Sequence, residues 1–191
     1  MIPVVLVHGI WNTAAIFTPL KTYLEKIGWP IYTFSMTPNN GAAPIEVLAQ
    51  QVEQFVSAAL GPHQPFHLIG FSMGGLISRY YLQRLGGLTR VQKFIAICAP
   101  HHGTVLAFGS TRYGVRQMRP NSTFIRALNW DIHRLEKIEV LSLWTPADLL
   151  ILPPWSAQLK IGTSRRLNIP SHNRMIRDTQ GLEAIAQILS S

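Results

Sequence analysis

The side chain best suited to chemistry in this sequence is a serine between two glycines, in the stretch GFSMG at residues 70–74. An apolar run over residues 65–71 leads into it, and a helical pattern over residues 73–85 follows at once. A G-x-S-x-G turn between a strand and a helix is typical of a nucleophile elbow, whose strained backbone projects the hydroxyl above a sheet. The alternative is a serine that caps a helix in a tight loop. In the first interpretation, Ser72 is a catalytic nucleophile.

An acyl-transfer site also needs two backbone N–H groups that face the charge forming on the substrate oxygen. The elbow supplies one such group at Met73, the first residue of the predicted helix. The stretch LVHGIW at residues 6–11 ends the first apolar run, and Ile10 is predicted to supply the second N–H, with Trp11 as the next choice. We interpret His8 as a structural residue beneath this loop rather than as a base.

Two later side chains complete a set that can activate the serine. Asp148 follows an apolar run at residues 137–146, and His172 lies in a polar loop before the last helical segment. Serine, then aspartate, then histidine is the chain order of α/β hydrolases, in which strand ends bring distant residues together. We therefore predict that Ser72 attacks an acyl carbon, that His172 carries the proton, and that Asp148 orients the imidazole.

Each of these assignments has a competing interpretation. Asp148 also fits the cap of a helical turn over residues 147–152. His101 and His102 follow the predicted strand at 91–100, so they should lie near the same edge, but they precede the aspartate in the chain. We expect both to be structural. Adjacent histidines also suggest metal ligands, but no carboxylate lies at a zinc-binding spacing, so we predict no metal site.

Apolar runs alternate with helical patterns along the chain. This alternation predicts an α/β fold, a three-layer sandwich with a mostly parallel central sheet and right-handed crossovers. We expect one domain over residues 1–191, with a short insertion or cap at about 103–136. The predicted strands lie at 4–9, 30–36, 65–71, 91–100, 137–146 and 157–162, and the predicted helices at 15–27, 45–60, 73–85, 122–135 and 181–190.

Composition limits the classes of partner. Apolar residues make up 47% of the chain and charged residues 14%, with a net charge of +8 that comes from scattered arginines. Such a surface favours anionic partners, so we expect contact with an anionic membrane surface, while no nucleic-acid-binding motif appears. No run is long enough to cross a bilayer, and the N-terminus does not resemble a signal peptide. We expect a cytoplasmic monomer in which Cys98 is a small buried hydrophobe.

Several segments together resemble the small α/β-hydrolase lipases and esterases, in particular compact bacterial triacylglycerol lipases. The resemblance is carried by VVLVHGIW, HLIGFSMGGLISRYYL, AICAPHHGT and TPADLLILP, and by the position of the histidine loop. It implies the minimal α/β-hydrolase fold and a cofactor-independent serine hydrolase. It also implies a triad of Ser72, Asp148 and His172, with an oxyanion hole from the amides of Ile10 and Met73.

The leading functional hypothesis is hydrolysis of carboxylic esters with an apolar acyl group, by way of an acyl-enzyme. Trp11, Phe17 and Leu149 are expected to line the substrate pocket, because binding sites are mostly apolar. A thioesterase or other acyl hydrolase of the same fold is an alternative, since fold and nucleophile do not fix the leaving group. A lipid- or protein-binding module without catalysis is the second alternative, which the order of serine, aspartate and histidine opposes.

Overall fold

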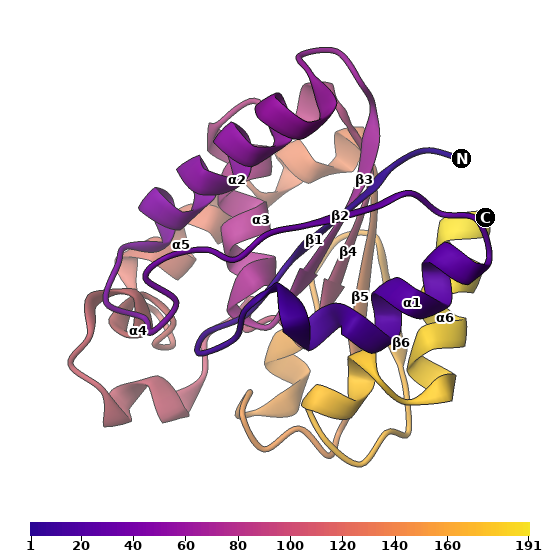
Figure 1. Cartoon of the computed structure of the whole chain (residues 1–191). Helices are drawn as coiled ribbons and strands as arrows, with labels where there is room; N and C mark the ends of the chain where they lie inside the picture. The colour runs from indigo at the N-terminus through magenta and orange to yellow at the C-terminus, as the bar shows by residue number, and fades with distance from the viewer.

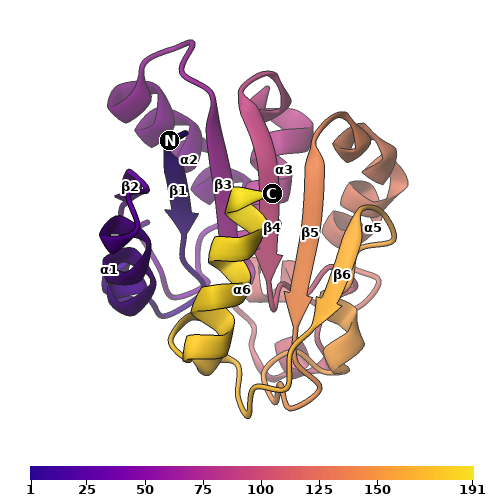
Figure 2. The ribbon, with the colours of Figure 1, turned by 90° about the vertical axis from the view of Figure 1, so that its right-hand side faces the viewer.

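The computed structural model describes residues 1–191 and contains one six-stranded sheet between two layers of helices (Figure 1). The strand order is β2-β1-β3-β4-β5-β6, and every neighbouring pair is parallel. The carboxyl ends of the strands therefore meet at one edge, the lower edge in Figure 2. The strands are β1 (Val4–Val7), β2 (Ile31–Thr33), β3 (Phe66–Phe71), β4 (Val91–Ile97), β5 (Glu139–Trp144) and β6 (Thr163–Arg166).

Helices cover both faces of the sheet, as an all-parallel sheet requires. Helices α1 (Thr18–Lys26) and α6 (Thr179–Ser190) lie on one face, and α2 (Ile45–Leu60) and α3 (Met73–Arg84) on the other, as Figure 1 shows. The short helices α4 (Tyr113–Gln117) and α5 (Thr123–Trp130) belong to the segment between β4 and β5. Short 3₁₀ helices occupy Ala14–Phe17, Gly87–Thr89, Val105–Gly109, Ile132–Lys137, Pro154–Ala157 and Asn173–Ile176.

The apolar runs form strands because both faces of the sheet are buried. Every residue of β1 and of β3 is buried, so side chains on both sides of each strand must be apolar or small. One core of 28 residues joins the sheet to α2 and α3, and a second of 24 residues joins it to α1 and α6. Helix α2 shows the matching helical period, since its buried positions are Ile45, Leu48, Ala49, Val52 and Val56.

The structure confirms the predicted α/β sandwich and corrects several boundaries. The strand predicted at 157–162 is wrong, because the sixth strand is β6 at Thr163–Arg166, after a turn in which Gly162 has φ +67°. All four β6 residues are exposed, and the strand pairs only with β5, so it carries no apolar pattern. The helix predicted at 122–135 ends at Trp130 and continues only as a 3₁₀ turn.

The segment at 103–136 rests on α3 through a buried cation. The Arg79 guanidinium is fully buried, and it donates to the Leu128 carbonyl (2.7 Å) and to Asn129 Oδ1 (2.9 Å). Burial lowers the pKa of Arg79 to about 9, so the group is still cationic at neutral pH. Because a buried cation without partners is costly, these contacts fix α5 against α3. No helix in the structure has the length and apolar character that a membrane span needs.

Candidate active site

Ser72 lies in the strained turn that the sequence predicts. It follows the last residue of β3 directly and precedes α3, with φ 57° and ψ −128°, a conformation that non-glycine residues rarely adopt. Its side chain makes no capping hydrogen bond, which excludes the helix-cap alternative. A Cβ atom on Gly74 would lie 2.1 Å from the Val7 carbonyl oxygen, and one on Gly70 would lie 2.6 Å from the Gly75 Cα. Close packing of the elbow therefore accounts for the glycines around Ser72.

The loop after β1 lies directly against this elbow. A Cβ atom on Gly9 would lie 2.8 Å from the Ser72 Cβ. The Trp11 amide donates to the Asn39 carbonyl (2.6 Å), whereas the Ile10 amide donates to no acceptor within the chain. Met73 begins α3, where an N–H has no acceptor in its own helix. The amides of Ile10 and Met73 are thus the candidates that remain for the oxyanion hole.

His8 is held as a structural residue. Its Nε2 accepts from the Met36 amide (2.9 Å), so its Nδ1 carries the proton and donates to the Gly9 carbonyl (2.8 Å). Burial lowers the pKa of His8, and the ring is neutral at pH 7. Both ring nitrogens are occupied beneath the loop, and neither is available to serve as a base.

Asp148 and His172, 24 residues apart in the chain, meet at the carboxyl edge of the sheet. His172 Nδ1 and Asp148 Oδ2 are 2.6 Å apart, and both side chains are buried. Asp148 Oδ1 accepts from the amides of Leu150 and Ile151, each at 2.9 Å. Burial alone would raise the pKa of Asp148, but the hydrogen bonds from His172 and from these amides hold it below its usual value. The aspartate both caps a turn and orients a histidine, so the two interpretations of it are compatible.

Ser72 and His172 line one cavity of about 270 Å³. With Nδ1 engaged by Asp148, Nε2 is the histidine nitrogen left to accept a proton. Eight of the thirteen lining residues are hydrophobic, so the space suits an apolar group beside a polar reacting centre. The lining consists of Ile10, Trp11, Asn12, Ser72, Thr104, Leu106, Ala107, Val115, Met118, Leu150, Ile151, His172 and Asn173.

The family model described as palmitoyl protein thioesterase matches residues 3–130. This chain belongs to that family. The matched region contains Ser72, Ile10 and Met73, and it ends before Asp148 and His172. The roles of the aspartate and the histidine in this family member are therefore argued from the geometry of the site.

Individual relatives agree with the family and with the fold. Palmitoyl-protein thioesterase 3 of Dictyostelium discoideum is 34% identical over an alignment of 110 residues that covers 53% of this chain and 36% of that relative. The match thus spans about a third of the length of the curated relative. The mature lipase BlEst2 of Bacillus licheniformis has the same fold, with TM-score 0.79, 17% identity, and coverage of 98% of this chain and 91% of the lipase. Lipase B of Aspergillus fumigatus gives TM-score 0.81 and 18% identity, over 100% of this chain and 52% of that one.

Two of the three residues predicted to line the pocket of this family member lie elsewhere. Trp11 lines the cavity and is two-thirds exposed at its mouth. The prediction for Phe17 is wrong, because its side chain is fully buried on the α1 side of the sheet. Its ring lies edge-on to the ring of Phe71, with 6.4 Å between the ring centroids. The prediction for Leu149 is also wrong, because it is 75% exposed and outside the cavity, while Leu150 lines it.

Sequence reasoning missed the contribution of the segment between β4 and β5. Leu106 and Val115 line the cavity, although their sequence context shows no motif, and Thr104, the last residue of the AICAPHHGT stretch, lines it as well. Met118 also lines it, whereas Phe124, which belongs to the same core as Met118, does not. These residues are brought to the cavity by the fold of the segment, which the sequence pattern does not predict.

The rival histidines do not lie in the cavity with Ser72. His101 is fully buried, neither of its ring nitrogens has a hydrogen-bond partner, and burial holds its pKa well below the usual value. Its carbonyl accepts from Asn129 Nδ2 (3.0 Å), which ties the loop after β4 to α5. His102 lines a different hollow. Of the histidines considered, His172 is therefore the one placed to act as the base.

Cys98 lies behind the aspartate and the histidine. Its Sγ and one ligand atom each of Asp148 and His172 lie within 4.8 Å of one another. Burial, followed by the charge of Asp148, raises the pKa of the Cys98 thiol well above its usual value. A metal ligand must be a thiolate, and both carboxylate oxygens already accept hydrogen bonds. These three residues consequently fit the buried side of a triad better than a metal centre.

Proposed function

We propose that this protein is a serine hydrolase that cleaves esters of apolar carboxylic acids through Ser72, His172 and Asp148. The observation that carries the proposal is the hydrogen bond between His172 and Asp148, in the same cavity as the strained Ser72. A nucleophile, a base and a group that orients the base are the three parts of this chemistry. Membership of a thioesterase family supports acyl transfer independently of that geometry.

The proposed reaction proceeds in two halves. Ser72 Oγ bonds to the acyl carbon as its proton passes to His172 Nε2, and the carbonyl oxygen becomes an oxyanion facing the amides of Ile10 and Met73. The bond to the leaving alcohol then breaks, and His172 returns the proton to that oxygen. Water repeats the sequence on the acyl-enzyme, which releases the acid and restores Ser72. Asp148 stays ionised and stabilises the imidazolium in both halves.

The cavity suits a short or medium acyl chain. Its volume of about 270 Å³ lies just below the usual range of small-molecule pockets, about 300–1,000 Å³. Its apolar wall includes Val115, Met118 and Ile151, of which Met is the most adaptable to different chain shapes. We expect the acyl group to lie against this wall and the leaving group to point toward the mouth near Trp11.

Hydrolysis of thioesters is a second candidate, and the family match favours it. The triad geometry accepts either class of bond, because the serine attacks the acyl carbon in both. A matched pair of substrates with the same acyl group, one an oxygen ester and one a thioester of a simple thiol, would separate the two. A higher kcat/KM for the oxygen ester supports the leading proposal, and the reverse order supports the family's named activity.

Labelling with a fluorophosphonate tests whether the protein is an enzyme of this class. We expect one modified residue, Ser72, with no labelling of the Ser72→Ala variant and strongly slowed labelling of His172→Ala. Ser164, an exposed serine on β6, provides the matched control, and Ser164→Ala should label like the original protein. Absence of labelling in a folded sample would refute the proposal and favour a binding module without catalysis.

A further inference from the structure

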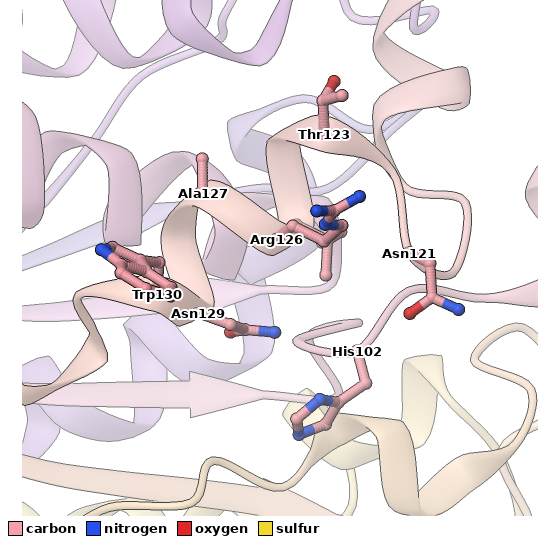
Figure 3. A pocket seen from close by; sticks show the side chains of 8 residues that line it. His102, Asn121, Thr123, Arg126, Ala127, Asn129 and Trp130 are labelled. Carbon is pink, nitrogen blue, oxygen red and sulfur yellow. The ribbon is translucent and has the colours of Figure 1, made fainter.

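A second hollow, of about 660 Å³, lies between α5 and the loop that follows β4 (Figure 3). It shares no lining residue with the cavity that contains Ser72. Most of its wall comes from α5 and from the approach to that helix, while a single imidazole faces it from the β4 loop. The lining consists of His102, Asn121, Thr123, Ile125, Arg126, Ala127, Asn129 and Trp130.

The charge in this hollow is positive and uncompensated. Arg126 is exposed, and its guanidinium makes no salt bridge and no hydrogen bond within the chain. No carboxylate lines the hollow. The neighbouring acid in the sequence, Asp131, is already paired with Arg84 (2.5 Å) and lies 3.7 Å from Arg134. A planar guanidinium with free donors suits phosphate, which it can bind through two parallel hydrogen bonds.

An aromatic surface lies beside this cation. Trp130 is 89% exposed, the highest value among the large hydrophobic residues of the chain. It follows Arg126 by four residues on α5, and both residues line the hollow, with Trp130 at the end of the helix and Arg126 extending the other way (Figure 3). An exposed indole offers a flat face on which a planar ring can stack. Arg126 and Trp130 thus place a cation and a stacking surface at separate points of the same hollow.

The frame of the hollow is rigid. Both polar atoms of the Asn129 side-chain amide are hydrogen-bonded: Oδ1 accepts from Arg79 (2.9 Å), and Nδ2 donates to the His101 carbonyl (3.0 Å). The His102 amide donates to the Ser156 carbonyl (3.2 Å), which fixes the facing loop. A fixed frame lowers the entropic cost of binding, because the wall need not be ordered by the ligand.

We propose that this hollow binds a phosphorylated compound that carries a flat ring, of the nucleotide class. Its phosphate would lie on Arg126 and its ring on Trp130, with Asn121 and Thr123 as further polar contacts. The source of such a ligand is either a free nucleotide or the nucleotide part of a substrate's leaving group. The proposal goes beyond the proposed function and does not depend on Ser72.

Calorimetric titration of the folded protein with ADP tests this proposal. We expect binding in the micromolar to low millimolar range, and weaker binding of adenosine, which lacks the phosphate, and of ribose 5-phosphate, which lacks the ring. Arg126→Gln and Trp130→Leu should each weaken ADP binding by about tenfold, as loss of a charged hydrogen bond or of one stacked base does. Arg166→Gln, which removes an exposed arginine from β6, is the matched control and should bind like the original protein.

Three results would overturn the proposal: no ADP binding at millimolar concentration, unchanged affinity in both variants with their melting temperatures preserved, or equal affinity for ribose 5-phosphate and ADP. Ser72→Ala should bind ADP normally, which separates this proposal from the catalytic one.

The source of the ligand is identified by comparing two acyl thioesters, one of a nucleotide-bearing thiol and one of a simple thiol. If Arg126→Gln raises the KM of the nucleotide-bearing thioester but not that of the simple thioester, the site binds the leaving group. If neither KM changes, the site binds a free nucleotide.

Discussion

Asp148 shows how one carboxylate can serve the fold and the chemistry together. Its Oδ1 caps the turn that positions Leu150 and Ile151, and its Oδ2 faces His172. The turn places two apolar residues in the wall of the cavity, so the same side chain that orients the base also shapes the acyl site. Removing the charge and removing the acceptor should therefore have different consequences.

Asp148→Asn should lower kcat by about 10³- to 10⁴-fold with little change in KM. The amide keeps an oxygen for the two capping N–H groups, but it no longer stabilises the imidazolium or selects the tautomer that leaves Nε2 free. Steady-state kinetics on a soluble ester measures this effect. Asp178→Asn, which changes the capping residue of α6, is the control and should retain activity. Equal kcat values in the two variants would remove Asp148 from the proposed triad.

His101→Leu should make stability less sensitive to acid. In the folded protein, burial holds the pKa of His101 well below 6.5, whereas the unfolded chain binds a proton at about that pH. As the pH falls below 6.5, the unfolded state therefore binds this proton before the folded state does. The free energy of unfolding then falls, and at pH 5 the loss due to His101 is up to about 2 kcal/mol. Urea unfolding of both proteins at pH 7.5 and pH 5 measures the difference. The same loss in both proteins would contradict the expectation.

The elbow is the element on which the site depends. Strand β3 and helix α3 converge at Ser72 so closely that Gly70 and Gly74 touch neighbouring backbone. The turn also carries the Met73 amide toward the loop after β1, where Gly9 lies against Ser72. Small residues at these positions let two chain segments approach the nucleophile, which larger side chains would exclude.

Gly74→Ala should destabilise the fold by about 1–3 kcal/mol or more, because the new methyl group would meet the Val7 carbonyl oxygen at 2.1 Å. Gly109→Ala is the matched control, since a Cβ atom there meets nothing within 4 Å and its backbone does not have positive φ. Chemical denaturation of the two variants gives the comparison. A Gly74→Ala protein as stable as the control would show that the elbow is less tightly packed than described.

Sequence patterns predicted the elements that bury apolar surface and the residues fixed by motifs. Strand β3 and helix α3 were predicted because burial imposes their pattern, whereas β6 is a fully exposed edge strand, held by backbone pairing, that leaves no such pattern. Apolar residues near a site cannot be sorted by sequence alone: Phe17 faces the core, and Leu149 and Leu150 point to different surroundings although adjacent. Which of them meets the cavity depends on the fold of the connecting segments.

At the scale of the whole molecule, the cavity opens onto a surface that is both apolar and basic. Trp11, Leu106 and Leu150 line the cavity and are exposed, and Val105, Phe108 and Leu149 are exposed and lie within two residues of Leu106 or Leu150 in the chain. We term these six residues the apolar rim. Arg112, Arg116 and Arg119 belong to the same segment as Phe108, and the net charge is +8. Exposed apolar residues grouped beside a binding site mark an interaction surface, and the surrounding charge favours an anionic one.

We propose that the apolar rim rests on anionic membranes, where an apolar ester would be met. Phe108→Ser combined with Leu149→Ser should weaken partitioning onto phosphatidylglycerol-containing vesicles by at least tenfold, since each side chain contributes about 1.5–3 kcal/mol on burial. Val47→Ser on α2 is the control, because that residue is also exposed but lies outside the rim.

Vesicle binding should also fall as NaCl rises from 0.05 to 0.5 M, because salt screens the attraction between the arginines and the anionic lipids. Sedimentation with vesicles measures both effects, and equal partitioning of the double variant and the control would show that the membrane does not contact this surface.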